Sequence, residues 1–118
     1  MGGWAPGKGR RSGGIGGLLV GYHDAPGAPE LRYAGRVGSG LTEAEIRALE
    51  GLFADLVVDA CPFDPPPPRA HAVDAVWLRP ELVVEVEYAE WTSDGRLRHP
   101  TYAGRRIDKD PEDVTAAP

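Results

Sequence analysis

The sequence predicts an all-β domain into which one helix is inserted. Two observations predict it. Short apolar or alternating stretches, each bounded by glycine, proline or other turn residues, recur five times along the chain. A single amphipathic stretch with helical spacing lies between the second and the third of them. The length of 118 residues fits one domain with a modest core.

The first two predicted strands form a hairpin. IGGLLVGYHD (15–24) is an apolar run that ends in turn residues, and LRYAGRVG (31–38) alternates along its length. The short APGAPE turn between them places the two strands side by side. We expect residues 1–14 to form a flexible, glycine-rich basic arm, 15–109 to form the folded domain, and 110–118 to be a frayed polar tail.

The clearest local signal is the helix that follows this hairpin. Thr42 and Glu45 have the spacing of a capping box. Apolar residues from Ile46 to Leu56 then recur at helical spacing, and the helix is expected to end near Asp59. One apolar face implies that the helix covers the open side of a sheet.

A proline-rich segment separates the helix from the remaining strands. CPFDPPPPRAHA (61–72) is expected to be an extended connector, because proline removes a backbone donor and fixes φ. VDAVWLRP (73–80) is predicted to be the third strand, stopped by Pro80.

The last two predicted strands form a second hairpin. ELVVEVEYAEWT (81–92) alternates strongly, and LRHPTYAGRRI (97–107) returns after the Asp94-Gly95 turn. Pro100 marks an edge or a bulge in the returning strand. The order of two strands, a helix and three strands indicates a five-stranded Greek-key barrel of the OB-fold type. The pattern alone leaves an SH3-like barrel and an α+β roll open.

Composition limits the possible functions. A formal net charge of −5 argues against a nonspecific nucleic-acid coat but allows a local basic face. The single cysteine, Cys61, excludes an internal disulfide and a cysteine-rich zinc site, and His23, His71 and His99 follow no metal-ligand spacing. No metal site is therefore predicted. The sequence has no secretory leader and no run long enough to span a membrane, so a cytoplasmic location is expected.

The charged stretch Arg106-Ile107-Asp108-Lys109 has two interpretations. On a strand, side chains two apart point the same way, so Arg106 and Asp108 can pair while Lys109 reaches beyond the strand. An arginine can donate two parallel hydrogen bonds to phosphate oxygens, and a lysine adds a mobile point charge. The stretch is therefore suited to binding a triphosphate. The alternative is a solvated strand end with weak surface ion pairs.

Six further cations are candidates for contacting the phosphates of a DNA backbone. Such contacts depend on positive charge and on a long side chain more than on precise geometry. The candidates lie in the N-terminal arm, in the second strand and in the last hairpin: Lys8, Arg10, Arg11, Arg36, Arg96 and Arg98. The alternative is a basic arm and exposed arginines that have no partner.

Several long stretches, in this order, resemble one family. They are GGW, PGKGRRSGGIG, LRYAGRVGSGLTEAE, CPF and VWLRPELVVEVEYAEWTSDGRLRHPTYAGRRIDKDPEDV. From Gly2 to Val114 the chain is similar to the C-terminal OB-fold domain of bacterial ATP-dependent DNA ligases of the end-joining kind. The resemblance implies that Arg106, Asp108 and Lys109 form the family's last nucleotidyltransferase motif, R-x-D-K. That motif would act in catalysis by orienting the pyrophosphate that leaves ATP.

The resemblance also implies partners. The domain would close on a ligase nucleotidyltransferase domain, with ATP and Mg²⁺ in the intact enzyme but neither bound by this domain alone, and would then contact nicked double-stranded DNA. Neither Lys8 nor Lys109 lies in the K-x-D-G motif of the nucleophile, so the chain is not expected to seal nicks by itself. Family members carry a strand before GGW, so the first barrel strand is expected to be truncated. The alternatives are a free-standing DNA-binding OB module and an inactive ligase remnant.

Overall fold

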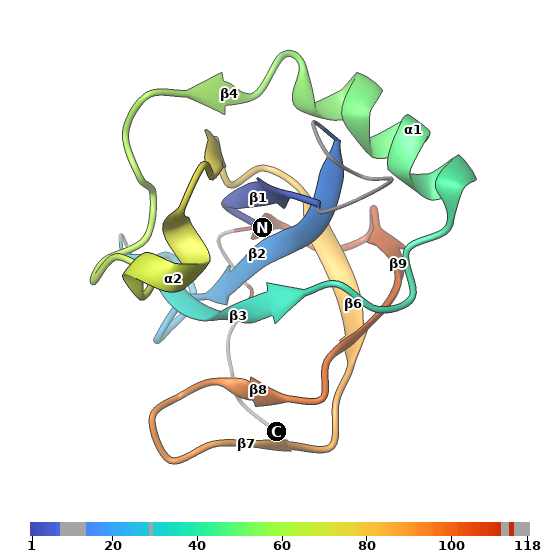
Figure 1. The fold of residues 1–118 in the computed structure, drawn as a ribbon. Coiled ribbons are helices and arrows are strands. Elements are labelled where there is room, and N and C mark those ends of the chain that lie inside the picture. Colours follow the sequence, from blue (N-terminus) through green and yellow to red (C-terminus); the bar gives the residue numbers. More distant parts are fainter. Residues whose placement is uncertain (8–13, 29, 112–113, 115–118) are drawn as a thin grey trace.

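Strands form most of the ordered structure, and one helix of three turns packs beside them (Figure 1). The computed structural model describes residues 1–7, 14–28, 30–111 and 114. The strands are β1 (Gly3–Pro6), β2 (Ile15–Tyr22), β3 (Arg32–Val37), β4 (Val57–Val58), β5 (Val76–Leu78), β6 (Val83–Glu87), β7 (Glu90–Trp91), β8 (Leu97–Arg98) and β9 (Thr101–Arg106). The helices are α1 (Glu43–Phe53) and α2 (Arg69–Ala72).

The strands form three antiparallel sheets. The largest has the order β3-β2-β1-β5-β4, and β6 pairs with β9 and β7 with β8. The predicted class, mostly β with one main helix after the first hairpin, is confirmed. No sheet closes on itself within the described residues, so the closed five-stranded barrel stays a prediction.

The start of the chain differs from the predicted arm, because Gly3–Pro6 form β1 in the middle of the largest sheet. Glycine here serves close packing rather than flexibility. A Cβ added at Gly3 would lie 2.8 Å from the carbonyl oxygen of Val76 on the neighbouring strand. The basic part of the predicted arm, residues 8–13 with Lys8, Arg10 and Arg11, lies outside the described residues. In the predicted frayed tail, the carbonyl of Val114 accepts a hydrogen bond from the His23 amide at 2.7 Å.

Helix α1 begins where its cap predicts and ends earlier than expected. The amide of Glu45 donates to the hydroxyl oxygen of Thr42 at 3.1 Å, which confirms Thr42 as the N-cap. The helix ends at Phe53 rather than near Asp59. The β-branched pair Val57–Val58 instead forms β4, which pairs with β5 and so takes these residues away from the helix.

The proline-rich connector also contains a short helix that was not expected. Arg69–Ala72 form α2, one turn long, immediately after the last proline of the segment, Pro68. A proline is tolerated at a helix start because the first amides have no partner within the helix. The predicted strand 73–80 shrinks to Val76–Leu78, since Asp74 adopts a left-handed conformation with φ 57° and turns the chain.

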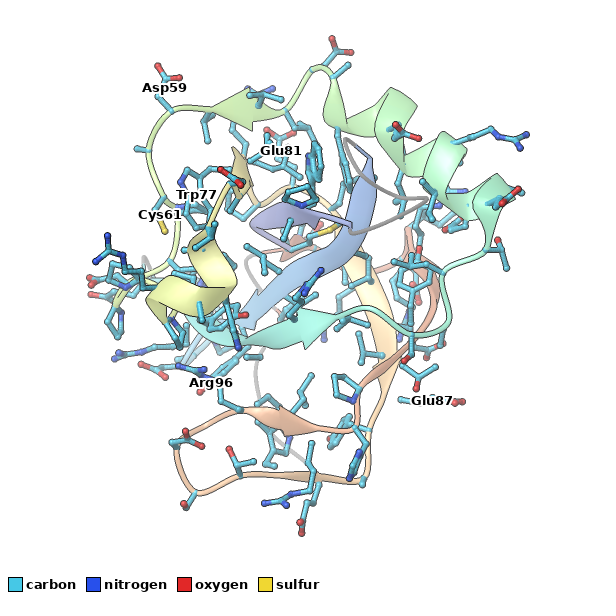
Figure 2. All side chains as sticks on the ribbon, in the orientation of Figure 1. Asp59, Cys61, Trp77, Glu81, Glu87 and Arg96 are labelled. Atoms are coloured by element: carbon cyan, nitrogen blue, oxygen red, sulfur yellow. The ribbon has the colours of Figure 1, made fainter. Side chains whose placement is uncertain are left out.

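Each strand of the second predicted hairpin is divided in two. The stretch 81–92 forms β6 and β7, and the stretch 97–107 forms β8 and β9. The second break falls at Pro100, which has no amide to donate, preceded by His99 with φ 54°. The predicted alternation is confirmed in β6, where Val84 and Val86 pack against the core and Glu87 points away from the domain (Figure 2).

Apolar side chains cover both faces of the largest sheet. The main core includes Leu18, Val20 and Val37 from β2 and β3, and α1 covers it with Leu49 and Phe53. A smaller core on the other face is formed by Leu19, Leu31, Tyr33 and Phe63, with Trp77 packed against it. Burying a large aliphatic or aromatic side chain contributes about 1.5–3 kcal/mol, so both clusters hold the sheet in place. Polar groups at the rims of these two faces form the candidate sites.

Candidate functional site

The end of β9 holds Arg106 in a fixed orientation. Its Nε and Nη2 atoms donate to the two carboxylate oxygens of Asp108 at 2.9 and 3.0 Å. This two-pronged pair is the one expected for residues two apart at the end of a strand. The hydrogen bond from Arg106 lowers the pKa of Asp108 to about 2, so the pair is charged throughout the neutral range.

The remaining edge of the Arg106 guanidinium faces a second carboxylate. Nη1 of Arg106 lies 3.7 Å from Oε1 of Glu85 on the adjacent strand β6. A shift in register between Glu85 and Val86, with Gly104 at φ 141°, marks a bulge in this strand pair just before the motif. Because Nη1 lies 3.7 Å from Glu85 while Nε and Nη2 lie within 3.0 Å of Asp108, Nη1 is the most weakly bound donor of Arg106. A phosphate oxygen can reach it in competition with Glu85.

Lys109 lies just beyond β9 and is exposed. It has no ion pair with any residue that the structure describes. Its charge is one of the smaller influences that lower the pKa of Asp108, so Arg106, Asp108 and Lys109 are neighbours in space as well as in sequence. The structure thus brings together the three residues that the R-x-D-K motif selects.

Glu45 connects this strand to helix α1, a role that the sequence did not reveal. Its carboxylate accepts a hydrogen bond from the Tyr102 hydroxyl at 2.5 Å and from Nε of Arg105 at 3.1 Å. Burial, followed by the bond to Glu45, raises the pKa of Tyr102. The capping-box spacing explained Glu45 by local structure alone, and its partners are 57 and 60 residues away. The contacts fix β9 one residue before Arg106.

A second group of polar side chains surrounds Tyr33 at the rim of the smaller core. The guanidinium carbon of Arg96 lies 4.7 Å from the centre of the Tyr33 ring, and the Tyr33 hydroxyl is 2.7 Å from Nδ1 of His71. Burial raises the pKa of Tyr33 to about 12, and the charges of Arg96 and Arg36 partly oppose that rise. Two of the predicted DNA contacts, Arg36 and Arg96, are therefore near enough to Tyr33 for their charges to influence its pKa.

A third predicted DNA contact, Arg98, has a carboxylate partner. It forms an ion pair with Glu90 across β7 and β8, with Nε and Oε1 2.9 Å apart. Lys8, Arg10 and Arg11 fall among the undescribed residues. His71 is a member of the cluster that sequence reasoning missed, because only its spacing to other possible metal ligands was considered.

Within the described part of the chain, no three histidine, cysteine, aspartate or glutamate side chains are grouped so that they could hold a metal ion. A cavity of about 190 Å³ lies between β2, β6 and the β7–β8 hairpin, lined mainly by apolar side chains such as Val20, Leu82 and Val84. It offers no cluster of cations to a phosphate. None of the described helices is long and apolar enough to cross a membrane.

Comparison with known proteins places this chain in a family. Residues 11–109 match the model of the ATP dependent DNA ligase C terminal region. The chain is 47% identical over 114 residues to the multifunctional non-homologous end joining protein LigD of Mycolicibacterium smegmatis. It is 37% identical over 101 residues to the LigD of Pseudomonas aeruginosa. These matches cover 97% and 86% of this chain but only 15% and 12% of the two relatives.

Solved structures agree with the sequence comparison. The ligase domain of Mycobacterium tuberculosis LigD superposes with a TM-score of 0.89 at 44% identity, and the match covers 99% of this chain and 37% of that one. A mycobacterial DNA ligase D complexed with ATP and MES superposes with a TM-score of 0.81, also at 44% identity, over 98% of this chain and 35% of that one. This chain belongs to the ATP-dependent DNA ligase family, in which it corresponds to the C-terminal region of the bacterial end-joining ligases.

Proposed function

We propose that this domain closes on a nucleotidyltransferase domain and assists the transfer of an adenylyl group from ATP to that domain's lysine. The observation that carries the proposal is the orientation of Arg106, whose guanidinium is held on one edge by Asp108 and lies only 3.7 Å from the exposed Glu85 carboxylate on the other. Lys109 adds a second exposed cation beside it. The same two residues occupy the R-x-D-K pattern of the family.

The chemistry requires positive charge where negative charge develops. ATP supplies the adenylyl group, and pyrophosphate is the leaving group whose charge grows as the bond to the α-phosphorus breaks. Arg106 and Lys109 would bind its oxygens, orient it in line with the attacking lysine and stabilise that charge. Asp108 would keep the Arg106 guanidinium in the required plane. Mg²⁺ would be held by the nucleotide and by the partner domain, since the described residues offer it no cluster of ligands.

We further propose that the strands form an OB-type, five-stranded Greek-key barrel in the intact ligase. Support comes from a parallel bridge between Ser39, just after β3, and Thr101 at the start of β9, where the Tyr102 amide donates to the Ser39 carbonyl at 2.8 Å. This bridge joins an edge of the largest sheet to the β6–β9 pair. An OB barrel commonly uses its strand faces to bind nucleic acid.

After adenylation, the domain would present a different face to nicked double-stranded DNA. In Figure 1, β9 runs beside β6 near α1, whereas α2 and the tip of the β7–β8 hairpin lie on the opposite side of the view. Arg96 lies on that second side (Figure 2), over the ring of Tyr33, and Arg36 is exposed on β3. Arg98 and the arm cations Lys8, Arg10 and Arg11 would add contacts with the DNA backbone.

The test uses a ligase in which this chain follows its nucleotidyltransferase domain. Arg106→Ala should reduce the rate of enzyme adenylation by about a hundredfold, the cost of removing one positioned donor from a developing charge. The matched control is Arg47→Ala, because Arg47 is an exposed arginine on α1 whose only ion pair within the described residues is with Glu43. It should leave adenylation unchanged.

Binding of nicked DNA separates the proposed role from general damage. Arg106→Ala should retain wild-type affinity for a nicked duplex in fluorescence anisotropy, because Arg106 acts on the nucleotide. An equal loss of adenylation and DNA affinity would contradict the role assigned to Arg106.

A further inference from the structure

The cluster around Tyr33 is not explained by adenylation. Arg96 stacks over the Tyr33 ring, and His71 hydrogen-bonds to its hydroxyl. Arg36 stands on the same strand as Tyr33, and the charges of Arg96 and Arg36 both act to lower the pKa of Tyr33 and the pKa of His71. The three basic side chains come from β3, from α2 and from the turn before β8, which lie far apart in the sequence.

A bulge places Tyr33 and Arg36 on the same face of the sheet. Residues three apart in a regular strand point to opposite faces. Here Leu19 pairs with Arg36 and Gly21 with Tyr33, with a shift in register between Val20 and Gly21. Since Leu19 and Gly21 are two apart on β2, their partners share one face, the face of the smaller core.

The neighbouring strand leaves room for Arg36. A Cβ added at Gly17 on β2 would lie 2.4 Å from Nε of Arg36 and 2.9 Å from its Cγ. The stem of Arg36 therefore lies directly over the bare backbone of Gly17. This contact limits the positions that the guanidinium can take, although the residue is exposed.

The β7–β8 turn orients Arg96. Its amide donates to the Thr92 hydroxyl at 3.0 Å, and the Thr92 amide donates to the Arg96 carbonyl at 2.7 Å. Figure 2 shows Arg96 on the side of the hairpin nearest β3. A guanidinium over an aromatic face is held by cation–π attraction while its N–H groups stay available to an anion.

His71 completes the cluster with a further donor. Burial first, and then the charges of Arg96 and Arg36, lower the pKa of His71, so the free side chain is neutral at neutral pH. Tyr33 keeps its proton, because its pKa is about 12. We therefore assign the hydroxyl as donor to Nδ1, which leaves the proton of the imidazole on Nε2.

These cations lack the carboxylate partners that other arginines have. Arg32, Arg79 and Arg98 form ion pairs with Asp24, Glu81 and Glu90. In the part of the chain that the structure describes, neither Arg36 nor Arg96 has such a partner. A phosphate bound at this face would be attracted by both unpaired charges.

We propose that Arg36, Arg96 and His71 form a subsite for a single phosphate group of the DNA backbone, with Tyr33 as the positioning residue. The proposal rests on the proposed function, which makes nicked DNA the anion that reaches this face. A phosphodiester carries one charge and needs no enclosed pocket. The adjoining groove, of about 310 Å³, also contains Asp24 and Asp94, whose carboxylates would repel the further charges of a polyphosphate.

The salt dependence of DNA binding tests the subsite directly. In the ligase carrying this chain, anisotropy of a labelled nicked duplex is measured between low and moderate salt. Losing one phosphate contact lowers the slope of log affinity against log salt by about 0.9. The double variant Arg36→Gln/Arg96→Gln should lose about 0.9 in total, because both arginines share one phosphate. Arg47→Gln is the matched control and should keep the wild-type slope.

A second variant keeps every charge in place. Gly17→Ala introduces a methyl group against Arg36 and should displace its guanidinium, with no positive φ to strain the backbone. Gly17→Ala should lower the affinity for DNA as the single variant Arg36→Gln does. It should leave the thermal midpoint of unfolding unchanged. A wild-type salt slope in both the Arg36→Gln/Arg96→Gln and the Gly17→Ala variants would overturn the single-phosphate subsite. A loss of about 1.8 from the slope in the double variant would also overturn it.

The pH dependence of binding tests His71. Tyr33 and Arg36 face it from β3, Arg96 faces it from the turn before β8, and Arg69 is its neighbour on α2. A bound phosphate raises the pKa of His71, so the added affinity is fully present at low pH and is lost as the pH rises through that raised value. Affinity should therefore rise from pH 8 to pH 6, and His71→Gln should abolish this rise. An unchanged rise in His71→Gln would remove His71 from the subsite.

The outcomes distinguish this subsite from the proposed function. If the Arg36 and Arg96 variants bind DNA normally while Arg106→Ala still loses adenylation, the subsite is wrong and the proposed function stands. If these variants slow adenylation without DNA and leave DNA affinity intact, the cluster contacts the nucleotidyltransferase domain instead, which also contradicts the subsite. An Arg106→Ala ligase that adenylates as fast as the wild type contradicts the proposed function itself.

Discussion

At the scale of single residues, Arg106 is shared between two carboxylates and the phosphate that we propose it binds. Asp108 holds the Nε edge with short, parallel hydrogen bonds, whereas Glu85 lies 3.7 Å from Nη1 and is more than half exposed. The two carboxylates therefore have opposite effects. Asp108 orients the guanidinium for phosphate, and Glu85 competes with phosphate for the remaining donor.

Glu85→Gln should strengthen the use of ATP. Removing the competing charge frees Nη1, and an exposed ion pair of this kind contributes at most about 1 kcal/mol, so KM for ATP in adenylation should fall by no more than about fivefold. Glu87→Gln is the matched control, because Glu87 lies on the same strand, points away from the domain and is exposed. A rise in KM for Glu85→Gln would contradict the proposed competition.

At the scale of secondary-structure elements, Glu45 attaches α1 to β9. Glu45→Gln weakens the hydrogen bonds to Tyr102 and Arg105 in a partly buried setting, and should lower the free energy of unfolding by about 1–3 kcal/mol. The control Glu50→Gln changes an exposed carboxylate on the same helix and should stay within about 0.5 kcal/mol. Urea unfolding of both variants provides the comparison. Equal stability of the two would show that Glu45 does not anchor the strand.

The secondary-structure elements also show which sequence signals were sufficient to predict where an element begins or breaks. Thr42 marked the start of α1 and Pro100 marked a break, because capping and the missing proline amide act locally. Strand β1 was missed because glycine residues indicate flexibility when their neighbours are unknown. Their actual role, close approach to Val76 on β5, depends on a residue more than 70 positions away. The early end of α1 likewise depends on the pairing of β4 with β5.

At the scale of the whole molecule, two sets of cations lie on different sides of one small domain. Arg106 ends β9 and Lys109 follows it, whereas Arg96 lies over Tyr33 and Arg36 is on the same face of the largest sheet as Tyr33. The first set could be selected from sequence because Arg106 and Lys109 fall, with Asp108, within one motif of four residues. The second could not be assembled, because it depends on a strand bulge and on contacts between residues 38 and more positions apart.

This separation fits a domain that serves two steps in turn. In the cycle that we propose, closing on the nucleotidyltransferase domain would bring the β9 end to the nucleotide, and turning away afterwards would present the Tyr33 side to DNA. A rigid domain with a separate binding group on each face can act in both steps without refolding. The central claim is that the first of these steps depends on Arg106.

Adenylation in trans tests that claim most directly. This chain is mixed with a separately prepared nucleotidyltransferase domain of a matching ligase, ATP and Mg²⁺, and the adenylate bound to protein is counted. We predict that adenylation rises when the chain is present, and that Arg106→Ala abolishes the rise while Arg47→Ala does not. A folded wild-type chain that leaves adenylation unchanged, or an Arg106→Ala chain that stimulates it as well as wild type, would contradict the proposed role.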